Sequence, residues 1–345
     1  MEYLGLPMLG CAALAMLAGI PVFPAMIGVA SAFAAFGVAA GAIPYGLLTA
    51  MPGRLIGLLE NDLLQALPLY VLMGALLNAT PLAGWIHAAI ARAARRTPAA
   101  GQLASLGLGA LLAPMNGSVG ASVAMLARIE EARPAAAPEP KLSIVCAASV
   151  LGVAVPPSLV LILLGDAMMR AHTEALNATG RFARVVNTQD VFRGALVPMG
   201  IVLALFLLIA WRRGRGSAPA PAPPLGARRA AVAIGAALSV GGLLGAVAAG
   251  AMYAVEAAAT GAFALSAASM ATGWLTRADW RRALRESMVL TGALFALFVA
   301  ASTFTLVFRA FGTDAVLAAW VAAAPGGAAG ATLMVLALIA ASALV

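Results

Sequence analysis

Long apolar runs separated by short polar, arginine-rich stretches are the main feature of this chain. A helix needs about 20 apolar residues to cross the hydrocarbon core of a bilayer. Eight apolar runs in this chain are long enough to predict membrane spans, and a ninth apolar run follows at 328–345. The predicted spans are residues 4–20, 25–48, 63–79, 142–164, 191–211, 230–250, 252–274 and 288–308. We therefore expect an all-α polytopic membrane protein.

Another apolar run, residues 101–126, is interrupted at its centre by the sequence Pro-Met-Asn-Gly-Ser-Val-Gly at 114–120. Helix breakers and polar residues at membrane depth are tolerated where they are buried in protein or line a cavity. The run therefore predicts a re-entrant helical hairpin, over 101–133, that enters and leaves the membrane on one side. A second break, Gly-Val-Ala-Val-Pro-Pro-Ser at 152–158, interrupts the predicted span 142–164.

These two breaks carry the chemistry that we expect. An interrupted helix leaves free N–H groups at one half-helix and free carbonyl groups at the other. The N–H ends favour a carboxylate, whereas the carbonyl ends, together with serine or asparagine oxygens, favour Na⁺. The alternative is that glycine and proline here only permit kinks and close helix packing. The sequence leaves both interpretations open.

The arginine-rich stretches indicate the orientation in the membrane. Basic residues flank the hairpin on both sides and recur at 212–229 and 277–285, and such clusters are retained in the cytoplasm. Counting spans then places the N-terminus and the loop 166–190 in the periplasm. Residues 85–96 are amphipathic, which predicts a helix lying in the cytoplasmic membrane interface.

The chain divides into two halves with the same order of elements. Elements that start near residues 4, 63 and 101 are matched, at an offset of about 225 residues, by elements that start near 230, 288 and 328, an internal symmetry typical of secondary transporters. We predict a first membrane repeat at 1–212, a cytoplasmic basic and Pro/Ala linker at 213–227, and an inverted second repeat at 228–345. At this offset the second tip and break would fall at about 341 and 382. We therefore expect the second repeat to be truncated, with roughly 90 residues needed to complete it.

Composition narrows the class of protein. The chain is 63% hydrophobic and 10% charged, whereas a soluble domain has roughly 25% charged residues. The net charge of +8 comes from arginines between the apolar runs, not from a basic stripe interleaved with aromatics, so we expect no nucleic-acid partner. Lys141 is the only lysine, which excludes a phosphate-binding Gly-Lys loop for ATP, and no Ser/His/Asp set is visible. We expect neither an enzyme nor a resident cofactor.

Four stretches in a fixed order carry a resemblance to a known family. They are Leu-Pro-Leu-Tyr-Val-Leu-Met-Gly-Ala-Leu-Leu at 67–77, the Asn-Gly-Ser tip, Ala-Ala-Ser-Val-Leu-Gly at 147–152 leading into Pro-Pro-Ser, and Glu-Ala-Ala-Ala at 256–259. In this combination the chain resembles, over essentially its whole length, the large membrane subunit of tripartite ATP-independent periplasmic (TRAP) transporters, DctM-like. It departs from the usual pattern at Asn116 and Val119, where serine is common.

The resemblance implies an elevator-type secondary transporter in the bacterial inner membrane. Such a permease imports a small organic anion, a carboxylate, with Na⁺ as the coupling ion, and works with a small membrane subunit and a periplasmic substrate-binding protein. Carried over to this sequence, the sodium-binding role falls on residues of the two breaks, which are Asn116, Gly117, Ser118, Gly152, Pro156, Pro157 and Ser158. The substrate-binding candidates are at the hairpin tip, namely Asn116, Ser118, Gly120 and Ser122.

Glu256 is a further candidate, because acidic residues within spans are costly and usually functional. Its position near the outer end of the span 252–274 fits a coupling carboxylate and an interfacial ion pair equally well. His87 and His172 have no second histidine or cysteine nearby in the sequence, so we expect neither to bind a metal. Two other functions stay open. One is an unrelated inverted-repeat carrier, and the other is a non-transporting membrane scaffold in which the hairpin is a packing device.

Overall fold

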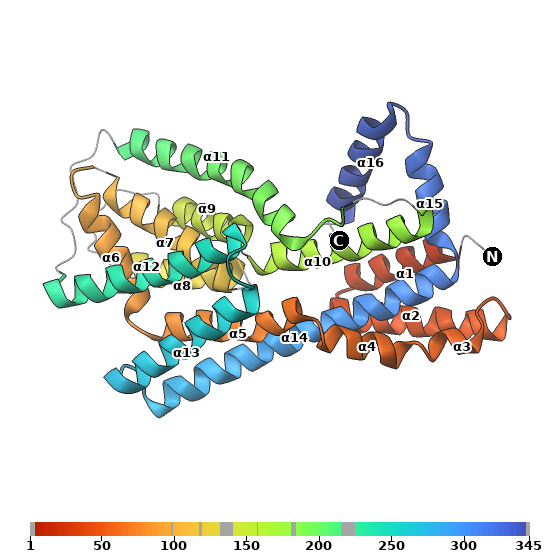
Figure 1. Ribbon diagram of the computed structural model, residues 1–345, viewed down its shortest axis with the longest axis horizontal. Coiled ribbons are helices and arrows are strands. Elements are labelled where there is room, and N and C mark those ends of the chain that lie inside the picture. The colour runs from red at the N-terminus through yellow and green to blue at the C-terminus, as the bar shows by residue number, and fades with distance from the viewer. Residues whose placement is uncertain are drawn as a thin grey trace. The chain divides into compact units, whose positions relative to one another are not determined.

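The computed structural model describes residues 4–97, 99–116, 119–131, 141–156, 158–180, 184–214 and 225–342. These residues form the helices α1 to α16, and no strand occurs among them (Figure 1). Five of these helices are long and apolar enough to cross a membrane, namely α2 (Val22–Ala39), α11 (Thr188–Gly214) over its segment Thr188–Arg212, α12 (Ala227–Ala249), α13 (Ala254–Thr272) and α14 (Arg277–Ala310). The predicted all-α, multi-pass membrane fold is confirmed.

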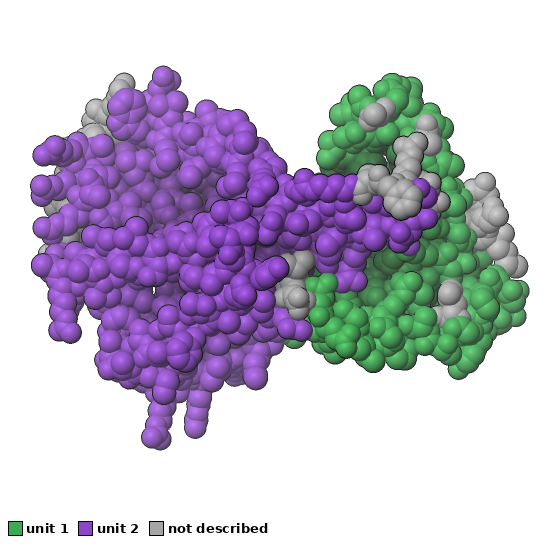
Figure 2. All heavy atoms as spheres, viewed as in Figure 1, with its two compact units in different colours: residues 1–61, 292–345 green, residues 62–291 purple. Residues whose placement is uncertain are grey.

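The helices gather into two compact units (Figure 2). Unit 1 comprises residues 1–61 and 292–345, and unit 2 comprises residues 62–291. Because the division falls within α14, that helix begins in unit 2 and ends in unit 1. The sequence-based division into repeats at 1–212 and 228–345, joined by the linker 213–227, stays a prediction, and the two units cut across it.

Unit 1 has an apolar core to which α1, α2 and the end of α14 contribute. Its helices are α1 (Gly5–Leu17), α2, α3 (Tyr45–Leu48), α4 (Met51–Leu59), the end of α14, α15 (Thr313–Ala322) and α16 (Gly327–Ser342). Met8, Ala34 and Phe304 are buried together in this core. The span predicted at 25–48 is shorter than expected and ends at Ala39, because Gly41 turns the chain with a φ of +68°. Glycine adopts that conformation at little cost, and it is a common way to end a helix.

Unit 2 contains the predicted hairpin. Its helices are α5 (Asp62–Ala79), α6 (Leu82–Ala93), α7 (Ala100–Asn116), α8 (Val119–Glu131), α9 (Lys141–Ala154), α10 (Leu159–Thr179), α11, α12, α13 and the start of α14. α7 packs against α6, α8 and α9, while α5 packs against α13. The α5–α13 contact depends on a small residue, because a Cβ atom at Gly261 would overlap the Sδ atom of Met73.

Two helices, α10 and α14, extend beyond the spans that the sequence predicts, and local backbone features explain where they end or begin. The segment predicted as a loop at 166–190 is helical as far as Thr179, where Gly180 ends α10 with a φ of +63°. The span predicted at 288–308 belongs to a longer helix that begins at Arg277. There the Thr276 N–H donates to Asp279 Oδ2 at 3.1 Å, and the Asp279 N–H donates to Thr276 Oγ1 at 3.2 Å. This reciprocal capping box starts the helix before the apolar run begins.

Candidate functional site

The first element of the candidate site is a helical hairpin formed by α7 and α8. Ser105 Oγ on α7 donates a hydrogen bond to Glu130 Oε1 on α8. Ser105 lies 12 residues before Gly117, and Glu130 lies 12 residues after Ser118. Because the two bonded residues are equally far from residues 117–118, which lie outside the described part of the structure, α7 and α8 run antiparallel, side by side. Both arms of the predicted hairpin are therefore helical and adjacent, and their re-entrant course through the membrane stays a prediction.

The hairpin packs closely on α9. A Cβ atom at Gly109 of α7 would lie 2.7 Å from both the Cβ atom and the carbonyl oxygen of Ala148. Real Cβ atoms do not come that close to neighbours, so only glycine fits this contact. Asn116 lies seven residues beyond Gly109, and Ala154 lies six residues beyond Ala148. At a rise of 1.5 Å per residue, the end of each helix is about 10 Å along its axis from the contact.

The second element is the break between α9 and α10. α9 ends at Ala154 and α10 begins at Leu159. Ser158 takes an extended conformation and caps α10, because its Oγ accepts a hydrogen bond from the Leu161 N–H at 3.2 Å. The Ser158 side chain is 1% exposed. A hydroxyl has two lone pairs, so capping leaves one lone pair of this buried oxygen for another ligand.

The structure places the predicted site residues on helices of the same unit. Gly152, in the last turn of α9, and Pro156, in the second break, are both buried, whereas on the hairpin helix α8 Gly120 is exposed and Ser122 is buried. Asn116 is the last residue of α7, but its side chain lies outside the described part of the structure, as do Gly117, Ser118 and Pro157. Because α9 packs against both α7 and α8, the two breaks are carried by neighbouring helices. The ion-binding and substrate-binding roles of these residues stay predictions.

A buried polar cluster ties the base of the hairpin to α6, and the sequence did not predict it. The cluster consists of His87, Ser105 and Glu130, whose side chains are almost fully buried. His87 Nε2 lies 3.0 Å from Ser105 Oγ and 3.6 Å from Glu130 Oε1. The Ser105 hydroxyl hydrogen is shared between Glu130 and the Gly101 carbonyl oxygen, which is 3.1 Å away. His87 Nε2 is thus within hydrogen-bonding distance of Ser105 Oγ, and the tautomer of the ring sets which of the two donates.

The arrangement of this cluster differs from that of a hydrolytic triad. In a triad the carboxylate holds one ring nitrogen of the histidine while the serine bonds to the other. Here Ser105 Oγ and Glu130 Oε1 both approach Nε2 of His87. The serine hydroxyl also donates to the carboxylate, so it is not poised to lose its proton to the histidine. The cluster fastens three helices together and has no nucleophile set up for catalysis.

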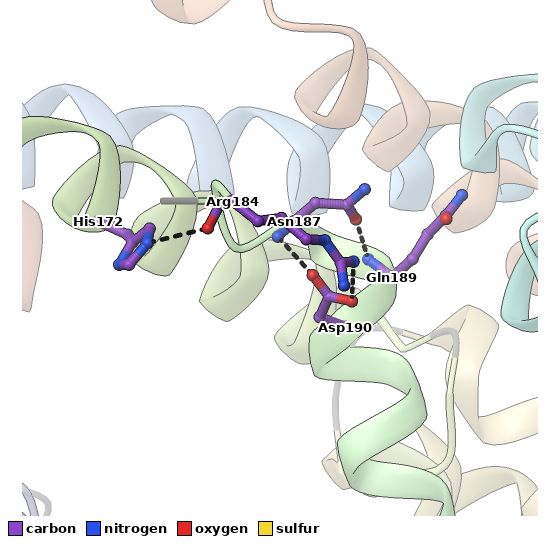
Figure 3. Close-up of polar contacts among 5 residues, drawn as sticks. All are labelled: His172, Arg184, Asn187, Gln189 and Asp190. Carbon is purple, nitrogen blue, oxygen red and sulfur yellow. Dashed lines mark hydrogen bonds and ion pairs between the residues drawn. The ribbon is translucent and has the colours of Figure 1, made fainter. Parts of the chain in front are cut away.

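A second polar network organises the segment between α10 and α11 (Figure 3). The Gln189 N–H donates to Asn187 Oδ1 at 2.6 Å, and the Asn187 N–H donates to Asp190 Oδ2 at 3.1 Å, so the side chains of Asn187 and Asp190 cap the start of α11. Arg184 Nη2 donates to Asp190 Oδ1 at 2.6 Å, and the Arg184 carbonyl oxygen lies 3.2 Å from His172 Nε2 on α10. The network therefore links α10 to the first turn of α11.

Comparison with known proteins decides the family. Over residues 9–345 the chain matches the family described as "Tripartite ATP-independent periplasmic transporter, DctM component". The chain belongs to the DctM family. No curated protein was found to match it. DctM proteins are the large membrane permeases of TRAP transporters, so the resemblance inferred from the sequence is confirmed. Membership implies a transporter rather than an enzyme, and association with a small membrane subunit and a substrate-binding protein.

Within this DctM chain, Glu256 has a structural role. It is exposed, and its Oε2 accepts a hydrogen bond from the Tyr253 N–H at 3.0 Å at the start of α13. An acidic side chain in the first turn of a helix satisfies a free N–H group and interacts favourably with the helix dipole. Capping alone therefore accounts for the position of Glu256. Its role as a coupling carboxylate stays a prediction.

Proposed function

We propose that this DctM chain is the permease of a sodium-coupled TRAP transporter in the bacterial inner membrane, with its N-terminus in the periplasm. The transporter imports a small organic anion, a carboxylate, which a periplasmic substrate-binding protein delivers. A small membrane subunit completes the complex.

The close contact between the hairpin and α9 carries the proposal. Both helix breaks lie about 10 Å along their helix axes from the Gly109–Ala148 contact. Pairs of interrupted helices that face each other are the usual way in which secondary transporters offer carbonyl oxygens to Na⁺ and N–H groups to an anion. In this chain the hairpin turn contributes Asn116 and Ser118, and the second break contributes the hydroxyl of Ser158.

Ser158 offers the sharpest test of sodium binding, because its capping and ligand roles can be separated. Replacing an N-cap serine by alanine costs about 1 kcal/mol of stability, but replacing it by glycine costs only a few tenths. Both changes remove the hydroxyl. We expect Ser158→Gly and Ser158→Ala to raise the half-saturating sodium concentration about fivefold, which corresponds to the loss of a neutral ligand worth about 1 kcal/mol. Only Ser158→Ala should also lower the thermal stability.

The measurement is sodium-dependent substrate uptake into proteoliposomes that contain the permease with its two partner subunits. Ser239→Ala is the matched control, because Ser239 is an exposed serine of α12, away from both breaks. The tip variants Asn116→Ala and Ser118→Ala should behave like Ser158→Gly. If the sodium dependence is unchanged in all of these variants, the breaks serve packing only. If proteoliposomes with the two partner subunits alone take up the substrate, the chain fits the scaffold alternative.

A further inference from the structure

Unit 2 has a cavity of about 430 Å³ whose lining is cationic and aromatic. Arg228 and Arg229 come from the first turn of α12, Trp85 comes from α6, and Trp274 follows the end of α13. None of the residues that line the cavity is acidic. Neither arginine is paired with a carboxylate in the part of the chain that the structure describes, so the cavity holds two uncompensated positive charges.

The walls of this cavity are held in place by specific contacts. The Arg229 guanidinium lies over the Trp85 ring, 5.6 Å from its centroid. Trp85 and Trp274 meet edge to face, with centroids 5.4 Å apart. Arg92 Nη1 on α6 donates to the Leu225 carbonyl oxygen at 3.1 Å, which fixes the start of α12 alongside α6 (Figure 1). A stacked guanidinium keeps its N–H groups free at the edge of the plane, so Arg229 is both fixed and able to donate.

The cavity lies where two membrane-spanning helices end. Arg228 is in the first turn of α12, and Thr272, another lining residue, is the last residue of α13. Both helices are long and apolar enough to cross a membrane. Tryptophan is enriched at the level of the lipid headgroups, and Trp85 and Trp274 are both half-buried here. The cavity is therefore at the boundary between membrane and water.

We propose that this cavity binds the phosphate of an anionic phospholipid headgroup. Arginine recognises phosphate oxygens through two parallel N–H bonds, and two arginines line the site. No side chain caps the N-terminus of α12. Its first N–H groups and the positive end of its dipole therefore also favour an anion beside Arg228 and Arg229.

The neighbouring surface favours a lipid over a soluble phosphate. Beyond the cavity, α12 exposes Val232 (36% exposed) and Leu238 (70% exposed), and α13 exposes Met270 (73% exposed). Val232 also lines the cavity. Because Val232 is both exposed and part of the lining, the cavity has an apolar edge on which acyl chains can lie, while the headgroup stays between the arginines. A water-soluble phosphate has no part that gains from this surface.

The test measures lipid retention by the purified full chain, using native mass spectrometry. Phosphatidylglycerol is the anionic probe, and phosphatidylcholine is the zwitterionic comparison. Each arginine near a membrane surface contributes about a fivefold gain in affinity for anionic lipid. We expect the double variant Arg228→Gln/Arg229→Gln to weaken phosphatidylglycerol binding about 30-fold and to leave phosphatidylcholine binding unchanged. Equal loss of both lipids, or no loss of either, overturns the proposal.

The double variant Arg281→Gln/Arg282→Gln is the matched control, because it removes the same charge from two exposed arginines of α14 outside the cavity. Because neither arginine lines the cavity, and solvent and salt screen their charges from a headgroup bound there, it should change phosphatidylglycerol binding by less than about twofold. If it weakens binding as much as the cavity variant, the lipid responds to overall charge and the site is not specific.

Two further arms complete the test. Trp85→Leu removes the ring beneath Arg229 and should weaken phosphatidylglycerol binding several-fold without any change of charge, so it tests the site even if the arginine variant does not fold. Unchanged binding in Trp85→Leu counts against the cavity.

Glycerol phosphate, the water-soluble headgroup, should fail to displace the lipid. Displacement by glycerol phosphate would show a site for a soluble phosphate and refute the lipid assignment.

Discussion

Replacement of Gly109 by alanine should loosen the hairpin from α9. The added Cβ atom would lie 2.7 Å from the Ala148 Cβ atom and 2.7 Å from the Ala148 carbonyl oxygen. The position of the alanine Cβ atom is fixed by the backbone, so neither this atom nor the carbonyl oxygen can move without shifting the helix. We therefore expect a cost near the upper end of the 1–3 kcal/mol that overpacking usually carries, about 3 kcal/mol.

Helix propensity acts in the opposite direction. Alanine is favoured over glycine in a helix interior by about 1 kcal/mol, so the net effect of Gly109→Ala is about 2 kcal/mol of destabilisation. Gly107, two residues earlier on α7, is the matched control, because a Cβ atom there would meet only the Ile90 side chain, at 3.4 Å. That is an ordinary van der Waals distance. Gly107→Ala should therefore be stabilising by up to about 1 kcal/mol.

The two variants should differ by about 3 kcal/mol, which is about 6–12 °C in melting temperature for a unit of this size. The assay is thermal unfolding of the detergent-purified protein. Ala148→Gly, added to Gly109→Ala, removes the Cβ clash but leaves the carbonyl clash, so it should restore only part of the loss. If Gly109→Ala melts at or above the temperature of Gly107→Ala, the close approach of α7 and α9 is wrong. The contact that carries the proposed function would then be absent.

Three other predictions follow from the contacts described above. Ser105→Ala should lower stability by about 1–3 kcal/mol in thermal unfolding, because the buried carboxylate and imidazole of the polar cluster lose their shared partner. A loss no larger than that of an exposed Ser→Ala change would argue against the cluster. Gly261→Ala should cost less than Gly109→Ala in the same assay, since the obstructing Met73 thioether is a flexible side chain that can move, and an equal cost would mean that it cannot. In a background without the two native cysteines, a cysteine at exposed Asn177 should be labelled from the periplasm, whereas one at exposed Arg281 should not. The opposite labelling would reverse the proposed orientation.

The two helix breaks could be predicted from the sequence because their signals are local. Proline has no N–H group to donate and restricts the residue before it, so two consecutive prolines strongly favour the end of α9 just before them. Ser158 is an N-cap residue of the preferred type, and it starts α10. The predicted hairpin tip at 117–118, between the end of α7 and the start of α8, has the same kind of local signal, in which glycine stands beside polar residues within an apolar run.

Helix lengths were predicted less well, because an apolar run marks only the part of a helix that lies in hydrocarbon. α10 continues into a segment expected to be a loop, where Arg170 Nε donates to Asp166 Oδ2 at 2.9 Å within the same helix. α14 likewise extends through the basic cluster 277–285, since its capping box starts the helix in the polar segment. Polar helical extensions of this kind are stabilised by i,i+4 pairs and caps, which a hydropathy pattern does not detect.

The buried polar cluster could not be predicted from the sequence for a different reason. His87 is 18 residues from Ser105, and Ser105 is 25 residues from Glu130, so only the packing of three helices brings them together. The amphipathic pattern predicted a helix around His87, and α6 confirms that this segment is helical. The position of that helix in the membrane interface stays a prediction. The pattern does not show that α7 covers the face that carries His87, leaving that side chain 3% exposed.

The sequence pattern also does not show which helices of the two halves pack together. Hydropathy and the Pro/Ala stretch separate the first half from the second, but in the structure α12 and α13 of the second half pack against α6 and α5 of the first. α13 also packs closely on α5, since a Cβ atom at Gly261 would overlap the Met73 Sδ atom. Closely packed interiors move as bodies rather than deform continuously. If the hairpin moves during transport, as an elevator mechanism requires, α12 and α13 must therefore move with it. The moving body would then contain helices from both halves of the sequence. Its boundary would not follow the division into repeats that the sequence predicts.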